Sequence, residues 1–294
     1  MTAIGFIGIG KMGAPMAARL RAAHYDLAVF DTSADALGDF LAVHQAMPAE
    51  TPRELAEVSD IVITMLPTSA IVAEVLHGPE GVLAGLGPGA LVIEMSSGVP
   101  SATQALAEDV RRAGGVLVDA PVSGGVARAI TGELAIMVGG PTAAVERARP
   151  ILTVMGTSIL PTGPVGTAHA MKALNNLVSA TGLLISVEAL LIGKRFGLDP
   201  EMMVDVLNAS TGMNNSTQKK LKPFVLSRRF DSGFGLELMV KDLAIALGIA
   251  QDGAVSAPLS SLSRELWAAA LAMDVGPDHT AIARYSEHLA GLEL

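Results

Sequence analysis

Short apolar runs alternate with stretches of helical spacing over the first half of the chain. The runs are the length of ordinary β-strands, and the segments between them repeat their apolar positions every three or four residues. They lie at Ala3–Ile7, Tyr25–Phe30, Asp60–Leu66, Ala90–Glu94, Val116–Asp119, Leu134–Val138 and Thr157–Leu160. Strands separated by helices in this way predict parallel βαβ units, whose ligands bind at the carboxyl ends of the strands.

The alternation ends near Gly163, and the later segments all have helical spacing. Further helices are expected at Pro200–Asn208, Ser216–Leu226, Leu236–Gln251, Pro258–Met273 and Thr280–Leu289. We therefore predict an α/β protein with two domains. Residues 1–163 would form a Rossmann-type domain with a doubly wound parallel sheet, and residues 164–294 an all-helical domain for substrate binding and oligomerisation.

A single long helix is expected to join the two domains. Residues 165–196 contain no proline, and there is no formal charge between Lys172 and Glu188. At about 1.5 Å per residue this predicts a rod of about 45 Å. Polar residues such as Asn175 and Ser179 interrupt the apolar stretch and would be costly in lipid. We therefore interpret it as a helix buried between two halves of the protein or between two subunits, not as a membrane span.

A glycine-rich turn follows the first predicted strand. Its pattern, Gly8-x-Gly10-x-x-Gly13, lies between a strand and a helix, and Asp31 ends the next strand. This context is typical of a dinucleotide site, where the glycines allow a tight turn, close approach of a pyrophosphate and close helix packing. Asp31 would bind the ribose hydroxyls and repel a 2′-phosphate, so we favour NAD over NADP. The predicted cofactor contacts in this turn also include Lys11 and Met12.

Other strand ends carry small or polar residues that would line the same cleft. Leu66-Pro67 and Ser97 follow two of the predicted strands, and Ser123-Gly124-Gly125 precedes a short helix. Small residues before a helix expose backbone N–H groups that bind carboxylates or phosphates. The alternative is that these are plain strand ends and that the serine only caps a helix.

Three polar residues share one face of the long helix. Lys172, Asn175 and Asn176 are spaced i, i+3 and i+4. A lysine is almost never buried without a partner, so the group is either a structural cluster or an active site.

Composition excludes several classes of function. The net charge is −9 and no basic run exceeds two residues, so a nucleic-acid partner is not expected. The chain has no cysteine, and its six histidines lack metal-ligand spacing, so no metal site is expected. The N-terminus lacks the pattern of a signal peptide, and we expect a cytoplasmic protein.

Four motifs together resemble the β-hydroxyacid dehydrogenase family, which includes 3-hydroxyisobutyrate dehydrogenases. They are GIGKMGAPM from Gly8, DAPVSGG from Asp119, GPVGTAHAMKALNN from Gly163 and KDLAIA from Lys241. The likeness covers essentially the whole chain. Imine reductases look similar but generally lack the lysine, and 6-phosphogluconate dehydrogenases have a much longer helical domain.

The resemblance implies a role for each matching residue. Lys172 would be the general acid/base, a role that needs a pKa lowered toward neutrality by burial or a nearby cation. Asn176 would hold the substrate, and Ser123, Gly124 and Gly125 would bind its carboxylate. Ser97, where the family usually has threonine, would contact the nicotinamide ribose. Lys241 and Phe234 would close over the nicotinamide, while Asn175 and Asn215 are further substrate contacts.

The first interpretation is an NAD-dependent dehydrogenase of a small 3-hydroxy acid, 3-hydroxyisobutyrate or threonate. The alternative is an NADPH-dependent reductase of glyoxylate, succinic semialdehyde or tartronate semialdehyde, and a remote one is a non-catalytic dinucleotide-binding scaffold. Two amides at Asn214 and Asn215 hint at a hydroxylated substrate. We interpret His169 as a structural histidine and expect Arg128 to face solvent. A homodimer or homotetramer is expected.

Overall fold

The computed structural model describes residues 2–294 and separates into two compact units. The first unit extends to Lys172, and the second is Ala173–Leu294. The boundary lies inside one long helix, whereas the sequence suggested a boundary at Gly163, where the last strand ends. Each unit is described by itself.

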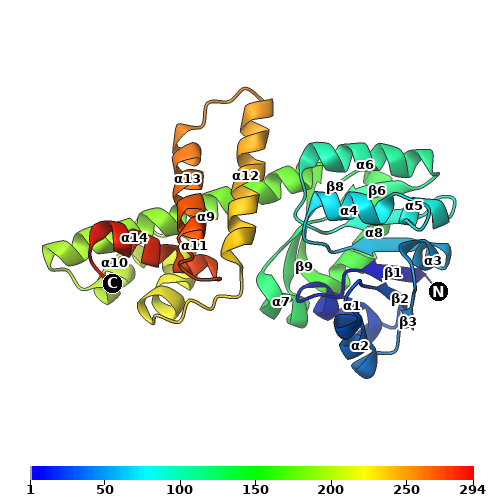
Figure 1. Ribbon diagram of the computed structural model, residues 1–294, viewed down its shortest axis with the longest axis horizontal. Helices are drawn as coiled ribbons and strands as arrows, with labels where there is room; N and C mark the ends of the chain where they lie inside the picture. Colours follow the sequence, from blue (N-terminus) through cyan, green and yellow to red (C-terminus); the bar gives the residue numbers. More distant parts are fainter. Residues whose placement is uncertain (1) are drawn as a thin grey trace. The chain divides into compact units, whose positions relative to one another are not determined.

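The first unit is built on one sheet that contains nine of the strands in residues 2–172 (Figure 1). Their spatial order is β3-β2-β1-β4-β5-β6-β8-β7, and β9 pairs with β8. The strands are β1 (Ala3–Ile7), β2 (Asp26–Phe30), β3 (Met47–Pro48), β4 (Ile61–Thr64), β5 (Leu91–Glu94), β6 (Val116–Asp119), β7 (Val122–Ser123), β8 (Leu134–Gly139) and β9 (Gly156–Gly163).

Helices cover both faces of this sheet, as expected for a doubly wound fold. They are α1 (Gly13–Ala22), α2 (Ala34–Val43), α3 (Pro52–Glu57), α4 (Ser69–Leu76), α5 (Val82–Gly85), α6 (Pro100–Arg112), α7 (Gly125–Thr131) and α8 (Thr142–Met155). Ile61 and Ile63 of β4 pack in the core beneath α1 and α8, whereas Val62 packs in the opposite core beneath α4 and α6. This alternation follows from the two-residue period of a strand. The predicted Rossmann-type architecture is confirmed.

The direction of the last strands differs from the prediction. The pairs from β3 to β6 are parallel, but β8 runs antiparallel to both β6 and β7, and β9 runs parallel to β8. The chain turns back after β7 through the short helix α7, so no full crossover helix places β8 parallel to β6. The two-residue strands β3 and β7 were not predicted, because so short a segment carries no visible period.

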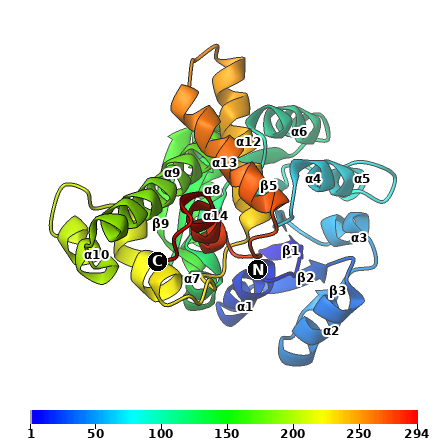
Figure 2. The same cartoon turned by 60° about the vertical axis from the view of Figure 1, so that its left-hand side comes forward.

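The second unit is helical. After α9 (Thr167–Phe196), which begins in the first unit, come α10 (Pro200–Asn208), α11 (Asn215–Lys219), the π-helical turn η1 (Leu221–Leu226), α12 (Leu236–Asp252), α13 (Pro258–Ala272), η2 (His279–Ala281) and α14 (Ile282–Ala290). The helices α12 and α13 lie side by side (Figure 1 and Figure 2). The predicted helix Ser216–Leu226 is interrupted because Pro223 has no N–H, and Val225 bonds back to Lys220 instead.

The helix α9 is long and apolar enough to cross a membrane by length and composition alone. However, half of its most apolar window is buried inside the protein. Leu183 and Leu190 of α9 are fully buried in the same core as Trp267 of α13. This packing agrees with the predicted core helix.

A buried polar cluster joins the start of α12 to η2. Asp278 accepts hydrogen bonds from the Ser232 hydroxyl and from the backbone N–H groups of Gly233 and Thr280. The ring of His279 is 3% exposed and stacks on Trp267. Burial, and next the charge of Lys220, lower the pKa of His279 to about 4.

We expect the stability of the helical unit to decrease in acid through His279. Its folded-state pKa of about 4 lies below the unfolded value of 6.5, so protonation favours the unfolded chain. The contribution of His279 to the free energy of unfolding is complete above the unfolded-state pKa. It is lost as the pH falls through the folded-state pKa, and the loss is up to roughly 3 kcal/mol. Chemical denaturation followed by circular dichroism, at about pH 7 and about pH 4.5, measures the loss. In the His279→Gln variant the pH dependence should be shallower; an equally steep loss would contradict this assignment.

Candidate active site

The glycine turn has the geometry that a dinucleotide site requires. Gly8 has a φ of +98°, and a Cβ there would lie 2.3 Å from the Met65 carbonyl oxygen. A Cβ on Gly13 would lie 1.8 Å from the Gly8 carbonyl oxygen, so only glycine lets α1 pack this closely on β1. A Cβ on Gly10 would meet nothing within 4 Å. Gly8 and Gly13 are therefore needed for the fold, whereas Gly10 keeps open the space where a pyrophosphate would approach.

Asp31 lies at the end of β2 and contacts the same turn. One of its carboxylate oxygens accepts a 2.7 Å hydrogen bond from the Ile9 N–H, and the other accepts one of 2.8 Å from the Ser33 N–H. A carboxylate has about four acceptor positions, so these bonds leave capacity for ribose hydroxyls. The proposed cofactor role of Asp31 thus comes with a structural role that the sequence did not reveal.

The ends of β4 and β5 lie beside the glycine turn. The Leu66 N–H donates to the Ser96 hydroxyl at 2.9 Å, and the Leu66 side chain would be 3.1 Å from a Cβ on Gly8. Pro67 follows Leu66, and the half-buried Ser97 follows the fully buried Ser96. The structure therefore places Leu66 at the turn, and the cofactor contacts of Leu66 and Pro67 stay predictions. Ser97 is the more exposed of the two serines and is therefore the one that a ligand could contact.

The predicted carboxylate loop forms the turn between β7 and α7. Gly124 and Gly125 have φ values of +137° and +70°, which L side chains rarely adopt. A Cβ on Gly124 would lie 2.7 Å from the Arg128 Cδ atom, so the arginine stem lies along the loop. Arg128 itself is exposed, as expected. Ser123 is half-buried at the end of β7.

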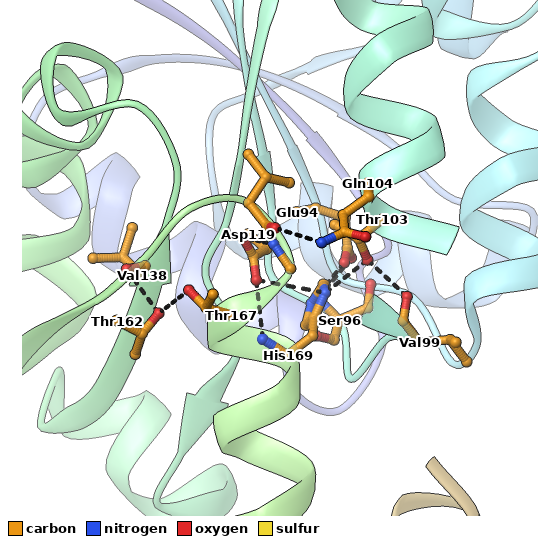
Figure 3. A network of polar contacts seen from close by, with 12 residues as sticks. Glu94, Ser96, Val99, Thr103, Gln104, Asp119, Val138, Thr162, Thr167 and His169 are labelled. Atoms are coloured by element: carbon orange, nitrogen blue, oxygen red, sulfur yellow. Dashed lines mark hydrogen bonds and ion pairs between the residues drawn. The ribbon is translucent and has the colours of Figure 1, made fainter. Parts of the chain in front are cut away.

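The start of α9 is tied to the ends of β5 and β6 by buried acids (Figure 3). Asp119 accepts hydrogen bonds from the N–H groups of Gly166 at 2.8 Å and His169 at 2.9 Å. The His169 Nε2 atom lies 2.8 Å from a carboxylate oxygen of Glu94. Lys172 follows one turn later and is only 7% exposed. The structure thus places the predicted catalytic lysine beside a fixed helix start.

The charges of this network stabilise one another. Burial alone lowers the pKa of the His169 imidazole, but the charge of Glu94 and then that of Asp119 outweigh it, so the pKa is raised. Burial raises the pKa of Glu94, yet the charge of His169 more than compensates and the net pKa is lowered. Burial keeps the pKa of Asp119 raised. Glu94 was not singled out from the sequence, where it was only the last residue of an apolar run.

The two asparagines of α9 belong to a hydrogen-bonded chain in the helical unit. The Asn176 amide donates to the Asp242 carboxylate at 2.6 Å, and the Asn175 amide donates to the Asn176 oxygen at 3.2 Å. The Lys241 Nζ atom lies 3.4 Å from Asp242. Asp242 is 2% exposed and was missed as a site residue. An acid within an otherwise apolar helix was the signal that could have identified it.

Three other predicted residues lie in the helical unit. Asn214 is the N-cap of α11, since its side-chain oxygen accepts from the N–H groups of Ser216 and Thr217. Its amide also donates to Ser186 of α9 at 3.0 Å. Of the two amides that suggested a hydroxylated substrate, that of Asn214 is therefore occupied by contacts within the protein, and Asn215 is exposed. Phe234 is partly buried and meets the edge of the His279 ring. Its role at the cofactor stays a prediction.

The comparisons with known proteins identify the family of the chain. Residues 3–163 match the family described as the NAD binding domain of 6-phosphogluconate dehydrogenase. Residues 166–286 match the family described as NAD-binding of NADP-dependent 3-hydroxyisobutyrate dehydrogenase. The chain belongs to the β-hydroxyacid dehydrogenase family. It is an NAD-dependent oxidoreductase that acts on a CH–OH group.

Individual relatives match over nearly the full length. The chain is 35% identical to 2-(hydroxymethyl)glutarate dehydrogenase of Eubacterium barkeri, over 99% of this chain and 97% of that protein. It is 39% identical to the mitochondrial 3-hydroxyisobutyrate dehydrogenase of Bos taurus, over 87% and 76%. The solved structure of Mycobacterium tuberculosis 3-hydroxyisobutyrate dehydrogenase with L-serine has a TM-score of 0.90 at 32% identity. That match covers 97% of this chain and 98% of that one.

No metal centre is evident in the part of the chain that the structure describes. Residues 2–294 contain no group of three or more metal-ligating His, Asp or Glu side chains.

The glycines of the turn should separate cofactor binding from folding. We expect the Gly10→Val variant to fold with a normal melting temperature but to bind NAD more weakly. The valine side chain would occupy the space where the pyrophosphate is expected to bind. Gly13→Ala should instead lower the melting temperature, because its Cβ overlaps the Gly8 carbonyl oxygen. Titration calorimetry and thermal unfolding measure the two effects. Unchanged NAD affinity in Gly10→Val would argue against this geometry.

Proposed function

We propose that the protein interconverts a small 3-hydroxy acid and its semialdehyde, with Lys172 as the general acid/base. The observation that carries this proposal is a lysine that is buried yet lies one turn after the fixed start of α9, in a chain that has the dinucleotide turn. The ends of β5 and β6, which hold that helix start, are at the same edge of the sheet as the glycine turn.

The proposed reaction transfers one proton and one hydride. Oxidation would remove a proton from the substrate hydroxyl and a hydride from its carbon, and NAD, when bound, would supply the acceptor for the hydride. Lys172 in its neutral form accepts the proton, and in the reverse direction its ammonium group returns it.

Neighbouring groups would hold the substrate while the proton moves. The Asn176 amide nitrogen has two hydrogens; one bonds Asp242, and the other can be directed at the substrate hydroxyl, one turn from Lys172. The Ser123 hydroxyl and the N–H groups of Gly124 and Gly125 would bind the carboxylate. Positive φ values in this loop suit N–H groups that converge on an anion.

The named substrates of the relatives suggest the substrate class. Serine, 3-hydroxyisobutyrate and 2-(hydroxymethyl)glutarate all have a CH₂OH group on the carbon next to a carboxylate, and they differ in the third substituent. We infer that this chain acts on an acid of the same type. The carboxylate loop and Lys172 would recognise the shared part, and the third substituent is left for experiment to identify. Asp31 supports NAD over NADP, because a second negative charge at the ribose would be repelled.

The experiment is an absorbance assay with acids that share this core and with threonate, a 3-hydroxy acid whose C3 hydroxyl is secondary. Serine, 3-hydroxyisobutyrate, 2-(hydroxymethyl)glutarate, threonate and glycerate would each be tested with NAD and with NADP. We expect turnover with at least one CH₂OH acid, and faster turnover with NAD. Reduction of glyoxylate or succinic semialdehyde alone, with NADPH, would support the reductase alternative. No turnover with any of them would contradict the proposal.

Removal of the lysine should stop the chemistry and spare cofactor binding. We expect Lys172→Ala to lower kcat by about 10²- to 10⁴-fold, the usual contribution of a general acid/base. Lys194→Ala, near the other end of α9, serves as the matched control and should leave kcat unchanged. NAD affinity, measured by fluorescence titration, should be similar in both. Full turnover in Lys172→Ala would rule out the proposed mechanism.

We also propose that the protein forms a homodimer or homotetramer through α9. Val178, Ile185 and Ile192 recur every seven residues on this helix and are 74%, 57% and 72% exposed. Apolar side chains at this spacing form a stripe typical of helix pairing. Light scattering should show an oligomer, which Ile185→Lys should weaken. A monomeric wild-type protein would contradict this proposal.

A further inference from the structure

His169 is enclosed by three separate segments of the first unit. Its side chain has no solvent exposure and meets Glu94 at the end of β5, Ser96 after it, Thr103 of α6, and Asp119 at the end of β6 (Figure 3). It belongs to the same helix as Lys172, three residues earlier. Side chains at this spacing have Cβ atoms about 5–6 Å apart, so the position of one constrains the other.

The hydrogen bonds around the ring define its protonation. Nε2 lies 2.8 Å from a Glu94 oxygen and 2.9 Å from the Ser96 carbonyl oxygen, so it faces two acceptors and carries a hydrogen. Nδ1 lies 2.8 Å from the Thr103 hydroxyl, which is also 3.1 Å from the Val99 carbonyl oxygen. If the hydroxyl donates to Val99, it can only accept from Nδ1. Every donor then meets an acceptor when His169 is an imidazolium.

The acids that face this imidazolium come from two strand ends. They are Glu94 and Asp119, whereas the Thr103 hydroxyl of α6 and the carbonyl of Val99, which precedes α6, are neutral. Removing such charges from water costs several kcal/mol per ion, and buried ion pairs often add little net stability. The network is therefore poorly explained by stability alone. Its most direct effect is to fix the orientation of the first turn of α9.

We propose that His169 is a positioning residue, which through Glu94 and Asp119 fixes the rotation of α9 and so directs the Lys172 amine toward the substrate. Asp119 holds the helix backbone at Gly166 and His169, and Glu94 holds the side chain of His169. A helix held at both points cannot rotate about its axis without breaking a charged hydrogen bond. This inference rests on the proposed role of Lys172.

The decisive comparison is between His169→Ala and His169→Gln. Glutamine can donate its two amide hydrogens to Glu94 and to the Ser96 carbonyl oxygen, the two acceptors that face Nε2, but it cannot carry a mobile proton. A positioning role predicts that alanine lowers kcat by about 10- to 100-fold, the cost of a misplacement near 1 Å. Glutamine should restore most of this loss. NAD affinity should stay within about twofold of wild type in both variants, since His169 does not contact the glycine turn.

Other outcomes would overturn the proposal. If glutamine is as inactive as alanine while both fold, His169 exchanges a proton instead of positioning the lysine. If kcat per folded molecule is unchanged in alanine and only the melting temperature falls, the role is structural. His288→Ala, an exposed histidine of α14, is the matched control and should behave as wild type.

A second pair of measurements keeps the test valid if His169→Ala does not fold. Thr103→Val removes the hydroxyl beside Nδ1 with little change in shape and should lower kcat several-fold without loss of NAD binding. Nitrogen NMR of His169, assigned by its loss in His169→Gln, should show both ring nitrogens protonated at neutral pH. A neutral ring, or wild-type kcat in Thr103→Val, would contradict the inference. Activity of Lys172→Ala would instead contradict the proposed function itself, so the two failures are distinguishable.

Discussion

The buried carboxylate of Asp119 is the group on which the start of α9 depends. It lies at the end of β6 and accepts from two backbone N–H groups, those of Gly166 and His169. The first N–H groups of a helix have no partner within the helix, and the positive end of the helix dipole lies there. Both features favour an acid at this position. Hydrogen bonds to charged groups stabilise by about 1.5–3 kcal/mol each. The position of Lys172 follows from this attachment.

The same arrangement occurs at three strand ends of the sheet, where an acid accepts a hydrogen bond from a neighbouring backbone segment. Asp31 after β2 accepts from Ile9, Glu94 in β5 accepts from Ser96, and Asp119 in β6 accepts from the start of α9. Each acid holds a neighbouring backbone segment at the edge where ligands of doubly wound folds bind. Glu94 is paired with His169 and Asp119 accepts from two backbone N–H groups, whereas Asp31 keeps acceptor capacity for ribose hydroxyls. An anionic cofactor or substrate can therefore approach an edge that contains three carboxylates.

The sequence predicted the parts of the site whose residues are close in the chain. The glycine turn, the loop at Ser123 and the face of Lys172 could be identified because each is a local pattern with a known geometry. Contacts between distant residues left no such pattern. The partner of Asn176 is Asp242, 66 residues away, and nothing near either residue indicates the other. Likewise, the direction of β8 depends on pairing across the sheet, which an apolar run does not encode.

Because α9 belongs to both units, neither unit is an independent folding module at the boundary where the strands stop. A chain cut after Gly163 would leave Asp119 buried with its two backbone donors removed. Such a carboxylate would either take up a proton or draw water into the core. The Rossmann-type unit therefore includes the first turn of the helix that follows it.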